Sequence, residues 1–253
     1  LRDKPTRAWA EEFNQFIEEL RRVFKTERPH LAPLTVVLFA RERDFAPYKP
    51  LRPDGRGPAP VGGLFNHYGN WSVIGLTGNY TAANTRALIF HEGVHWFMSN
   101  DPVIYPLWLS EGLAEVFSTF QQHRGKVRWG TDLDSHVVLL REQEMLPFER
   151  FLYTSHEDPL FNEQDRTSMF YAQAWIFVHY LMFGAHDGSR DALGSYFDHL
   201  AAGVHPDEAF QKAFGHDYRA MAETLSQYIR TGHYEMRIRP ESRAAKIQVT
   251  STK

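Results

Sequence analysis

The chain has 253 residues, 43% of them hydrophobic, which is enough to bury a full core as one domain or as two closely packed subdomains. Its net charge of −3 and the lack of a basic run argue against a nucleic-acid-binding protein. No apolar run approaches the length of a membrane span, and without cysteine there are neither disulfides nor thiolate metal ligands. The chain begins at Leu1 rather than Met and carries no signal peptide, so we expect that an upstream segment was removed or left out, as in an exported protein. The lack of cysteine is compatible with an exported or a cytosolic protein.

Helical and strand patterns alternate in the first sixty residues. Aromatic residues and leucine recur at helical spacing between residues 6 and 24, which predicts an amphipathic helix that covers a sheet. The run Leu34–Ala40 is continuously apolar and predicts a buried strand, and Arg41–Phe45 predicts a short helical turn. Residues 46–60 contain five prolines and two glycines, which predicts an exposed loop.

A hairpin is predicted next, with strands over Val61–Tyr68 and Trp71–Leu76 on either side of a Gly-Asn turn. Gly62 and Gly63 at the start of the first strand would let another backbone approach closely. His67 in the same strand can face a cleft, but a lone strand histidine is more often at the surface or in packing.

Helical patterns fill the C-terminal half, after a polar stretch at Gln121–Gly130 that predicts a turn or a short hairpin. The predicted helices cover Asp134–Glu144, a short segment opening at Leu146-Pro147-Phe148, Ser168–Phe183, Arg190–Ala202, Pro206–Phe214 and Tyr218–Arg230. Glycines at 203, 215 and 232 stand where helices would stop, and Asp217 can cap the last one. Tyr153–Asp165 is expected to be an irregular loop, and the polar, basic tail is compatible with a strand at Ile247–Val249.

The stretch F-H-E-G-V-H-W at residues 90–96 carries the chemistry. On a helix, His91 and His95 are four residues apart and project from one face, so both can bind one cation at about 2.0–2.1 Å. Glu92 points toward the same cleft but is offset, where a general base belongs if the metal carries a water. The alternative is an amphipathic helix with two solvated histidines. The flanking residues are apolar, however, and burying these polar groups without compensation would cost several kcal/mol.

Thr81 or Asn84 can cap this helix, which is predicted to end near Met98. Gly93 inside it costs about 1 kcal/mol relative to Ala. We therefore expect a neighbouring strand or helix to pack closely at this position.

The stretch W-L-S-E-G-L-A-E at residues 108–115 supplies a third ligand. Catalytic zinc usually takes three protein ligands and leaves a fourth position to water. Glu111 lies on a second apolar helix, and Pro102 and Pro106 force a turn before it, so that the two helices can run side by side. Glu115, one turn further on, can accept the free N–H of a ligand histidine and hold its tautomer.

With these two strings the chain resembles the gluzincin metallopeptidases, which include thermolysin-like enzymes and leukotriene-hydrolase-type aminopeptidases. It looks closest to the bacterial peptidase MA-like domains. The resemblance is specific over about residues 85–118, and the loop between Trp96 and Ser110 is slightly shorter than in those relatives. We expect an α+β, gluzincin-like fold, in which a small N-terminal sheet packs on the zinc helix and a helical subdomain follows. The metallopeptidase domain would span residues 1–233, divided into 1–98 and 99–233, with a tail at 234–253.

The resemblance also implies two further site elements. In gluzincins an exposed edge strand lies above the zinc helix and pairs with extended substrate, and the strand that begins at Gly62, Gly63 and Leu64 has the matching place in the order. An ordinary hairpin with a glycine bulge is the alternative. Tyr171 opens a string, Y-A-Q-A-W-I-F-V-H-Y-L, that is similar to the helix whose tyrosine donates to the oxyanion in aminopeptidase-type gluzincins. It can equally be a packed core tyrosine, and His179 is expected to be structural or at the surface.

The function predicted from these residues is zinc-dependent hydrolysis of a peptide or protein substrate. One zinc per chain would be held by His91, His95 and Glu111, with Glu92 as base and Tyr171 as oxyanion donor. Because residues 62–67 lack the carboxylate that related aminopeptidases use to anchor an α-ammonium group, internal cleavage is predicted. Three alternatives stay open, namely a non-catalytic module that keeps a structural zinc, a zinc hydrolase of a non-peptide amide or ester, and a scaffold built on a peptidase fold.

Overall fold

The structure is a computed structural model that describes residues 3–25, 32–52, 54–77, 82–100, 104–156, 158, 164–184 and 189–241. Its helices and two small sheets confirm the predicted α+β class. The chain divides into two compact units. Unit 1 comprises residues 1–104, 117–129 and 237–253, and unit 2 comprises 105–116 and 130–236. The domain boundaries predicted from the sequence stay a prediction.

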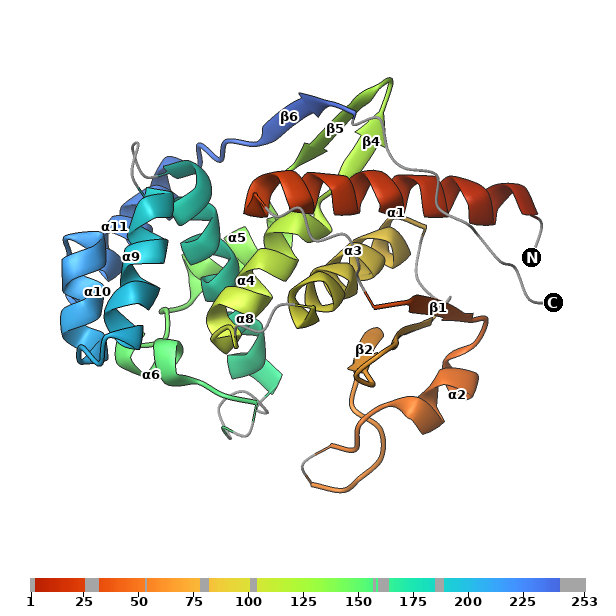
Figure 1. Cartoon of the computed structure of the whole chain (residues 1–253). Coiled ribbons are helices and arrows are strands. Elements are labelled where there is room, and N and C mark those ends of the chain that lie inside the picture. Colours follow the sequence, from red (N-terminus) through yellow and green to blue (C-terminus); the bar gives the residue numbers. More distant parts are fainter. Residues whose placement is uncertain are drawn as a thin grey trace. The chain divides into compact units, whose positions relative to one another are not determined.

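Unit 1 contains both sheets and the helix that carries the two histidines (Figure 1). Its elements are α1 (Asp3–Phe24), β1 (Leu34–Phe39), α2 (Glu42–Phe45), the 3-10 helix η1 (Ala46–Tyr48), β2 (Gly63–His67), β3 (Ser72–Thr77), α3 (Ala82–Ser99), β4 (Gln121–His123), β5 (Lys126–Trp129) and β6 (Arg237–Pro240). The first sheet has the strand order β1-β3-β2, with β1 parallel and β2 antiparallel to β3. The predicted hairpin is therefore confirmed, and β2 lies at one edge of this sheet.

The core of unit 1 forms where α1 runs alongside α3 (Figure 1). A Cβ on Gly93 would lie 2.8 Å from Cε2 of Phe13 and 2.9 Å from Cε1 of Phe16. The ring of Phe16 also packs on Phe90, with ring centroids 4.8 Å apart. The close packing expected at Gly93 is thus confirmed, and α1 provides it.

The prediction that Leu34–Ala40 is a buried strand is wrong in its burial. Val36, Val37 and Leu38 are 45%, 37% and 40% exposed. The reason is position in the sheet, since β1 is an edge strand whereas the central strand β3 is mostly buried, with extensive contacts to α3. A short apolar run cannot by itself distinguish these two positions.

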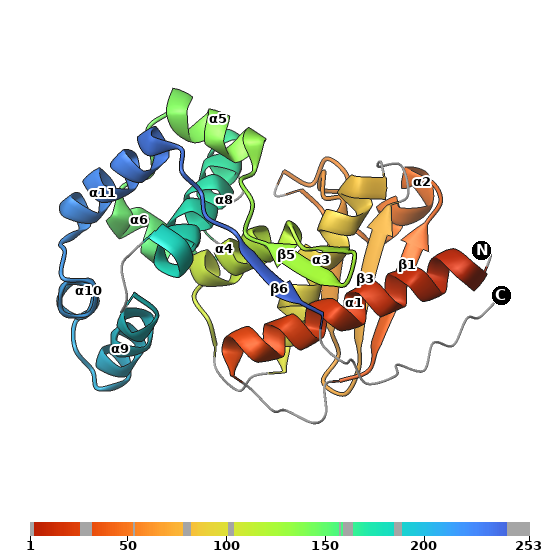
Figure 2. The ribbon, with the colours of Figure 1, turned by 90° about the horizontal axis from the view of Figure 1, so that it is seen from above.

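The second sheet joins distant parts of the chain. The predicted short hairpin at residues 121–130 is confirmed as β4 and β5, and β6 pairs antiparallel with β5 (Figure 2). Strand β6 was not predicted from the sequence, because the string R-I-R-P has no run of apolar residues. Arg239 of β6 places Nη1 3.4 Å from Oε1 of Glu19, which is 2% exposed. A long-range ion pair thus accompanies the strand pairing. The strand considered at Ile247–Val249 lies outside the described residues.

Unit 2 is helical. It contains α4 (Leu107–Ser118) up to Val116, and all of α5 (Asp134–Glu142), α6 (Phe148–Tyr153), α8 (Gln164–His179), the π-helix η2 (Tyr180–Gly184), α9 (Ser189–Ala201), α10 (Pro206–Phe214) and α11 (Tyr218–Thr231). Residues 172–178 of α8 are all at most 2% exposed, so α8 is the central helix rather than one with a single buried stripe. Among the described helices, none combines the length and apolar character needed to cross a membrane.

The predicted helix ends in unit 2 are confirmed. Gly203, Gly215 and Gly232 adopt φ angles of 78°, 68° and 63°, the left-handed conformation that glycine adopts without strain. Asp217 caps α11, since its Oδ1 accepts a hydrogen bond from the backbone N–H of Ala220 at 2.8 Å. These signals are local, which is why the sequence was sufficient to find them.

Candidate metal centre

The two histidines lie on the least buried side of α3. Most residues of this helix between Ile89 and Met98 are buried, whereas His91 and His95 are intermediate. Spacing of four residues puts both imidazoles on one side of the helix. Their Nε2 atoms are 3.3 Å apart. The helix therefore aims two nitrogen atoms at one point.

This separation fits two ligands of one zinc ion. Tetrahedral zinc with Zn–N bonds of about 2.0–2.1 Å holds its nitrogen ligands about 3.3–3.4 Å apart. A hydrogen bond between two neutral imidazoles would have a similar length, so the two histidines alone do not distinguish a metal site from a polar pair. The place of the third predicted ligand, Glu111, is therefore the next observation to consider.

Glu111 completes the set. It lies in the second turn of α4 and is 4% exposed. One ligand atom from each of His91, His95 and Glu111 lies within 4.8 Å of the others. Two imidazoles and a carboxylate form a nitrogen and oxygen ligand set that suits zinc. The residues present therefore fit the metal that the sequence predicts.

Gly112, the residue after Glu111, explains how α4 is held in place. A Cβ at this position would lie 2.4 Å from the backbone oxygen of Ala174 and 2.5 Å from Cγ2 of Val178. The two helices can approach this closely only because glycine has no side chain. Packing against the central helix α8 thereby fixes the turn of α4 that presents Glu111.

Glu92, the predicted base, is 9% exposed and lies against the start of β2. A Cβ on Gly63 would be 2.8 Å from Oε1 of Glu92 and 3.0 Å from Cδ2 of Leu76. The glycine pair predicted the close approach of another backbone, whereas in the structure a carboxylate lies there. Gly63 is buried, and Gly62 and Leu64 are partly buried. Their role in binding substrate stays a prediction.

Tyr171 and Glu115 are the two remaining predicted residues. Tyr171 is partly buried in α8, with its ring edge-on to Phe170 at 6.1 Å between centroids. Its role as an oxyanion donor stays a prediction. Oε2 of Glu115 lies 3.2 Å from Nε2 of His136, a residue of α5 that the sequence analysis did not single out. A lone histidine in a helix carries no signal from which this pairing could have been predicted.

The other two histidines considered have no part in the metal group. His67 is exposed and its Nδ1 lies 2.9 Å from Oγ of Ser72. His179 is fully buried, with Nδ1 2.9 Å from the hydroxyl of Tyr228 and Nε2 2.9 Å from the oxygen of Gly130. Burial lowers the pKa of His179 below its ordinary value. His179 was expected to be structural or at the surface, and its burial identifies it as structural.

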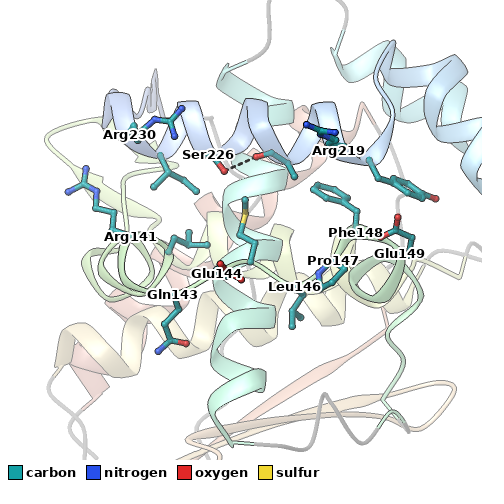
Figure 3. A pocket seen from close by; sticks show the side chains of 15 residues that line it. Arg141, Gln143, Glu144, Leu146, Pro147, Phe148, Glu149, Arg219, Ser226 and Arg230 are labelled. Atoms are coloured by element: carbon teal, nitrogen blue, oxygen red, sulfur yellow. Dashed lines mark hydrogen bonds between the residues drawn. The ribbon is translucent and has the colours of Figure 1, made fainter.

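A cavity of about 690 Å³ lies elsewhere in unit 2, along α11 (Figure 3). Arg141 and Arg230 stand at one end, and Arg219 and Glu149 at the other (Figure 3). None of the predicted site residues lines it. The candidate centre is therefore identified from its side chains and not from this cavity.

One comparison with known proteins matches the part of the chain that contains the candidate metal centre. A family model described as "Protein of unknown function (DUF1570)" matches residues 85–202. The matched part includes the three predicted ligands and also Glu115, His136 and Tyr171. No curated protein and no solved structure matches the chain.

Proposed function

We propose that this protein is a zinc-dependent peptidase of the gluzincin type that cleaves peptide bonds within a chain. The observation that carries the proposal is the convergence of one atom each from His91, His95 and Glu111 within 4.8 Å. When bound, zinc supplies Lewis acidity, which acidifies water and polarises a carbonyl oxygen.

The protein's own residues would perform the remaining steps. Glu92 would take the proton of the attacking water and pass it to the leaving amine as the C–N bond breaks. Its position against Gly63 supports this role, because β2 brings bare backbone next to the carboxylate. An extended substrate could pair with β2, the edge strand, and would then pass close to Glu92. Tyr171 would donate its O–H to the oxyanion, a contribution of about 2.7–4 kcal/mol.

Metal content tests the proposal first. Elemental analysis of protein purified without added metal should give one zinc per chain. His91→Ala and Glu111→Ala should each remove the zinc, because two ligands hold it too weakly. The matched control is His67→Ala, which deletes an exposed histidine outside the group and should leave the zinc in place. Full occupancy in both ligand variants would refute the assignment.

Hydrolysis of casein tests the activity. Glu92→Gln keeps the size of the side chain but cannot accept a proton, so the rate should fall by at least about 10² with zinc retained. Loss of zinc in Glu92→Gln would instead make Glu92 a ligand. A protein that binds zinc but hydrolyses neither casein nor a peptide library would be the non-catalytic module. Activity on amide or ester compounds alone would identify the non-peptide hydrolase.

A further inference from the structure

Glu115 and His136 form a contact beside the proposed metal ligand Glu111. Glu115 lies four residues after Glu111 on α4, so the two carboxylates share one face of that helix. Nε2 of His136, on α5, lies 3.2 Å from Oε2 of Glu115. Through this contact α5 reaches the face of α4 that carries Glu111.

The pair is largely withdrawn from water. Each of the two side chains is only 17% exposed. The ring of His136 also packs on the fully buried ring of Trp175, with centroids 5.9 Å apart. The imidazole is therefore held between a ring on α8 and a carboxylate on α4. An ionised carboxylate can only accept hydrogen bonds, so this contact requires the form of His136 that carries a proton on Nε2.

We propose that His136 is a positioning residue for the metal centre, which acts by holding the carboxylate of Glu115. This inference rests on the proposed function and on the predicted role of Glu115 as a support for the metal ligands. Glu111 and Glu115 carry like charges one turn apart, and a hydrogen bond donated to Glu115 offsets their repulsion. His136 also holds the Glu115 carboxylate in one orientation. In this orientation Oε2 accepts the hydrogen bond from His136, and Oε1 can accept a hydrogen bond from a second donor. Partners of this kind raise metal affinity because they orient the groups around the ligands.

The alternative is that the pair only ties α5 to α4. In that case removing His136 would lower the stability of the fold and leave the zinc affinity as it was. The two interpretations therefore differ in a measurable property other than activity.

The experiment measures the zinc Kd by competition with a chelator. His136→Phe keeps a ring against Trp175 but removes the donor, and it should weaken zinc binding by about threefold to tenfold. This is less than the about 10–100-fold typical of a group that contacts a ligand directly. His136→Gln, with an amide N–H near the position of Nε2, should stay within about twofold of the wild type. In a Glu115→Ala background, His136→Phe should have no further effect, because the effect runs through Glu115.

Each outcome has a separate meaning. A wild-type protein that binds no zinc would overturn the proposed function and this inference together. A wild type that binds zinc, with the same Kd in His136→Phe, would overturn the inference alone. If His136→Phe weakens zinc binding equally in the wild-type and the Glu115→Ala backgrounds, His136 does not act through Glu115. If His136→Phe does not fold, His136→Asn makes the same test, because its shorter side chain cannot reach Glu115. Thermal unfolding without metal reports the structural role of the pair.

Discussion

The carboxylate of Glu92 occupies the space that a side chain on Gly63 would need. A Cβ on Gly63 would lie 2.8 Å from Oε1 and 3.2 Å from Cγ of Glu92. Real Cβ atoms do not approach other atoms this closely, so any larger residue at position 63 must displace the carboxylate. The position of the proposed base and the identity of the first residue of β2 are thus coupled.

Gly63→Ala should therefore impair hydrolysis without removing zinc. The added methyl pushes the flexible carboxylate of Glu92 aside, and displacing a catalytic group by about 1 Å can cost on the order of 10² in rate. Casein hydrolysis and zinc content should be measured together. Gly75→Ala is the matched control, since it adds a methyl to the paired strand 3.1 Å from Phe45 and away from Glu92. Full activity of Gly63→Ala would show that Glu92 does not need its observed position.

Replacing glycine by alanine should have opposite effects on stability at two positions within helices, Gly112 and Gly194. Gly112→Ala drives a methyl into the backbone oxygen of Ala174, and overpacking of this kind costs about 1–3 kcal/mol. A Cβ on Gly194, in α9, would meet nothing within 4 Å. Gly194→Ala should therefore stabilise the helix by up to about 1 kcal/mol. Thermal unfolding should show a lower melting temperature for the first variant and a higher one for the second. Equal shifts would contradict the close approach of α4 and α8.

His179 should make the stability of the protein depend on pH. Burial lowers the pKa of this side chain, chiefly by removing the charged ring from water, while the oxygen of Gly130 acts in the opposite direction. In the unfolded chain the ring of His179 takes up a proton at about pH 6.5. In the folded protein it does so only at a lower pH, because its pKa is lowered. The stability that His179 contributes is thus fully present above that pH and is lost as the pH falls toward the lowered pKa.

Urea denaturation of His179→Gln with a chelator present tests this pH dependence. At pH 7.5 the variant should be less stable than the wild type, and the gap should narrow at pH 5, because glutamine does not titrate. The exposed His123→Gln controls for the loss of one histidine. Curves that stay parallel over this range would mean that His179 is protonated equally in both states.

Peptides with a blocked N-terminus test the predicted mode of cleavage. The described strand β2, Gly63–His67, carries no carboxylate that could pair with an α-ammonium group. An extended chain needs only the strand backbone, so N-acetylated peptides should be cut at internal bonds. The products can be identified by mass spectrometry. Release of free amino acids from unblocked peptides, with no cleavage of acetylated ones, would reverse this prediction.

The sequence by itself was sufficient for features that depend on neighbours along the chain. Four-residue spacing put His91 and His95 on one side of a helix, because the helical period is the same in any fold. Glycine at 215 and at 232 marked helix ends for a similar reason, since the left-handed conformation is a property of the residue itself. These signals therefore needed no knowledge of the rest of the molecule.

Only the tertiary structure decided which groups meet from different elements. It put Glu92 against Gly63, paired Glu115 with His136, and left Val36 exposed on an edge strand. Periodicity tells which side of an element a residue occupies, but not what lies opposite, because that depends on the packing of segments far apart in the chain. Local spacing therefore determined that His91 and His95 share one side of a helix. The residues around them depend on packing between distant segments, which no single segment encodes.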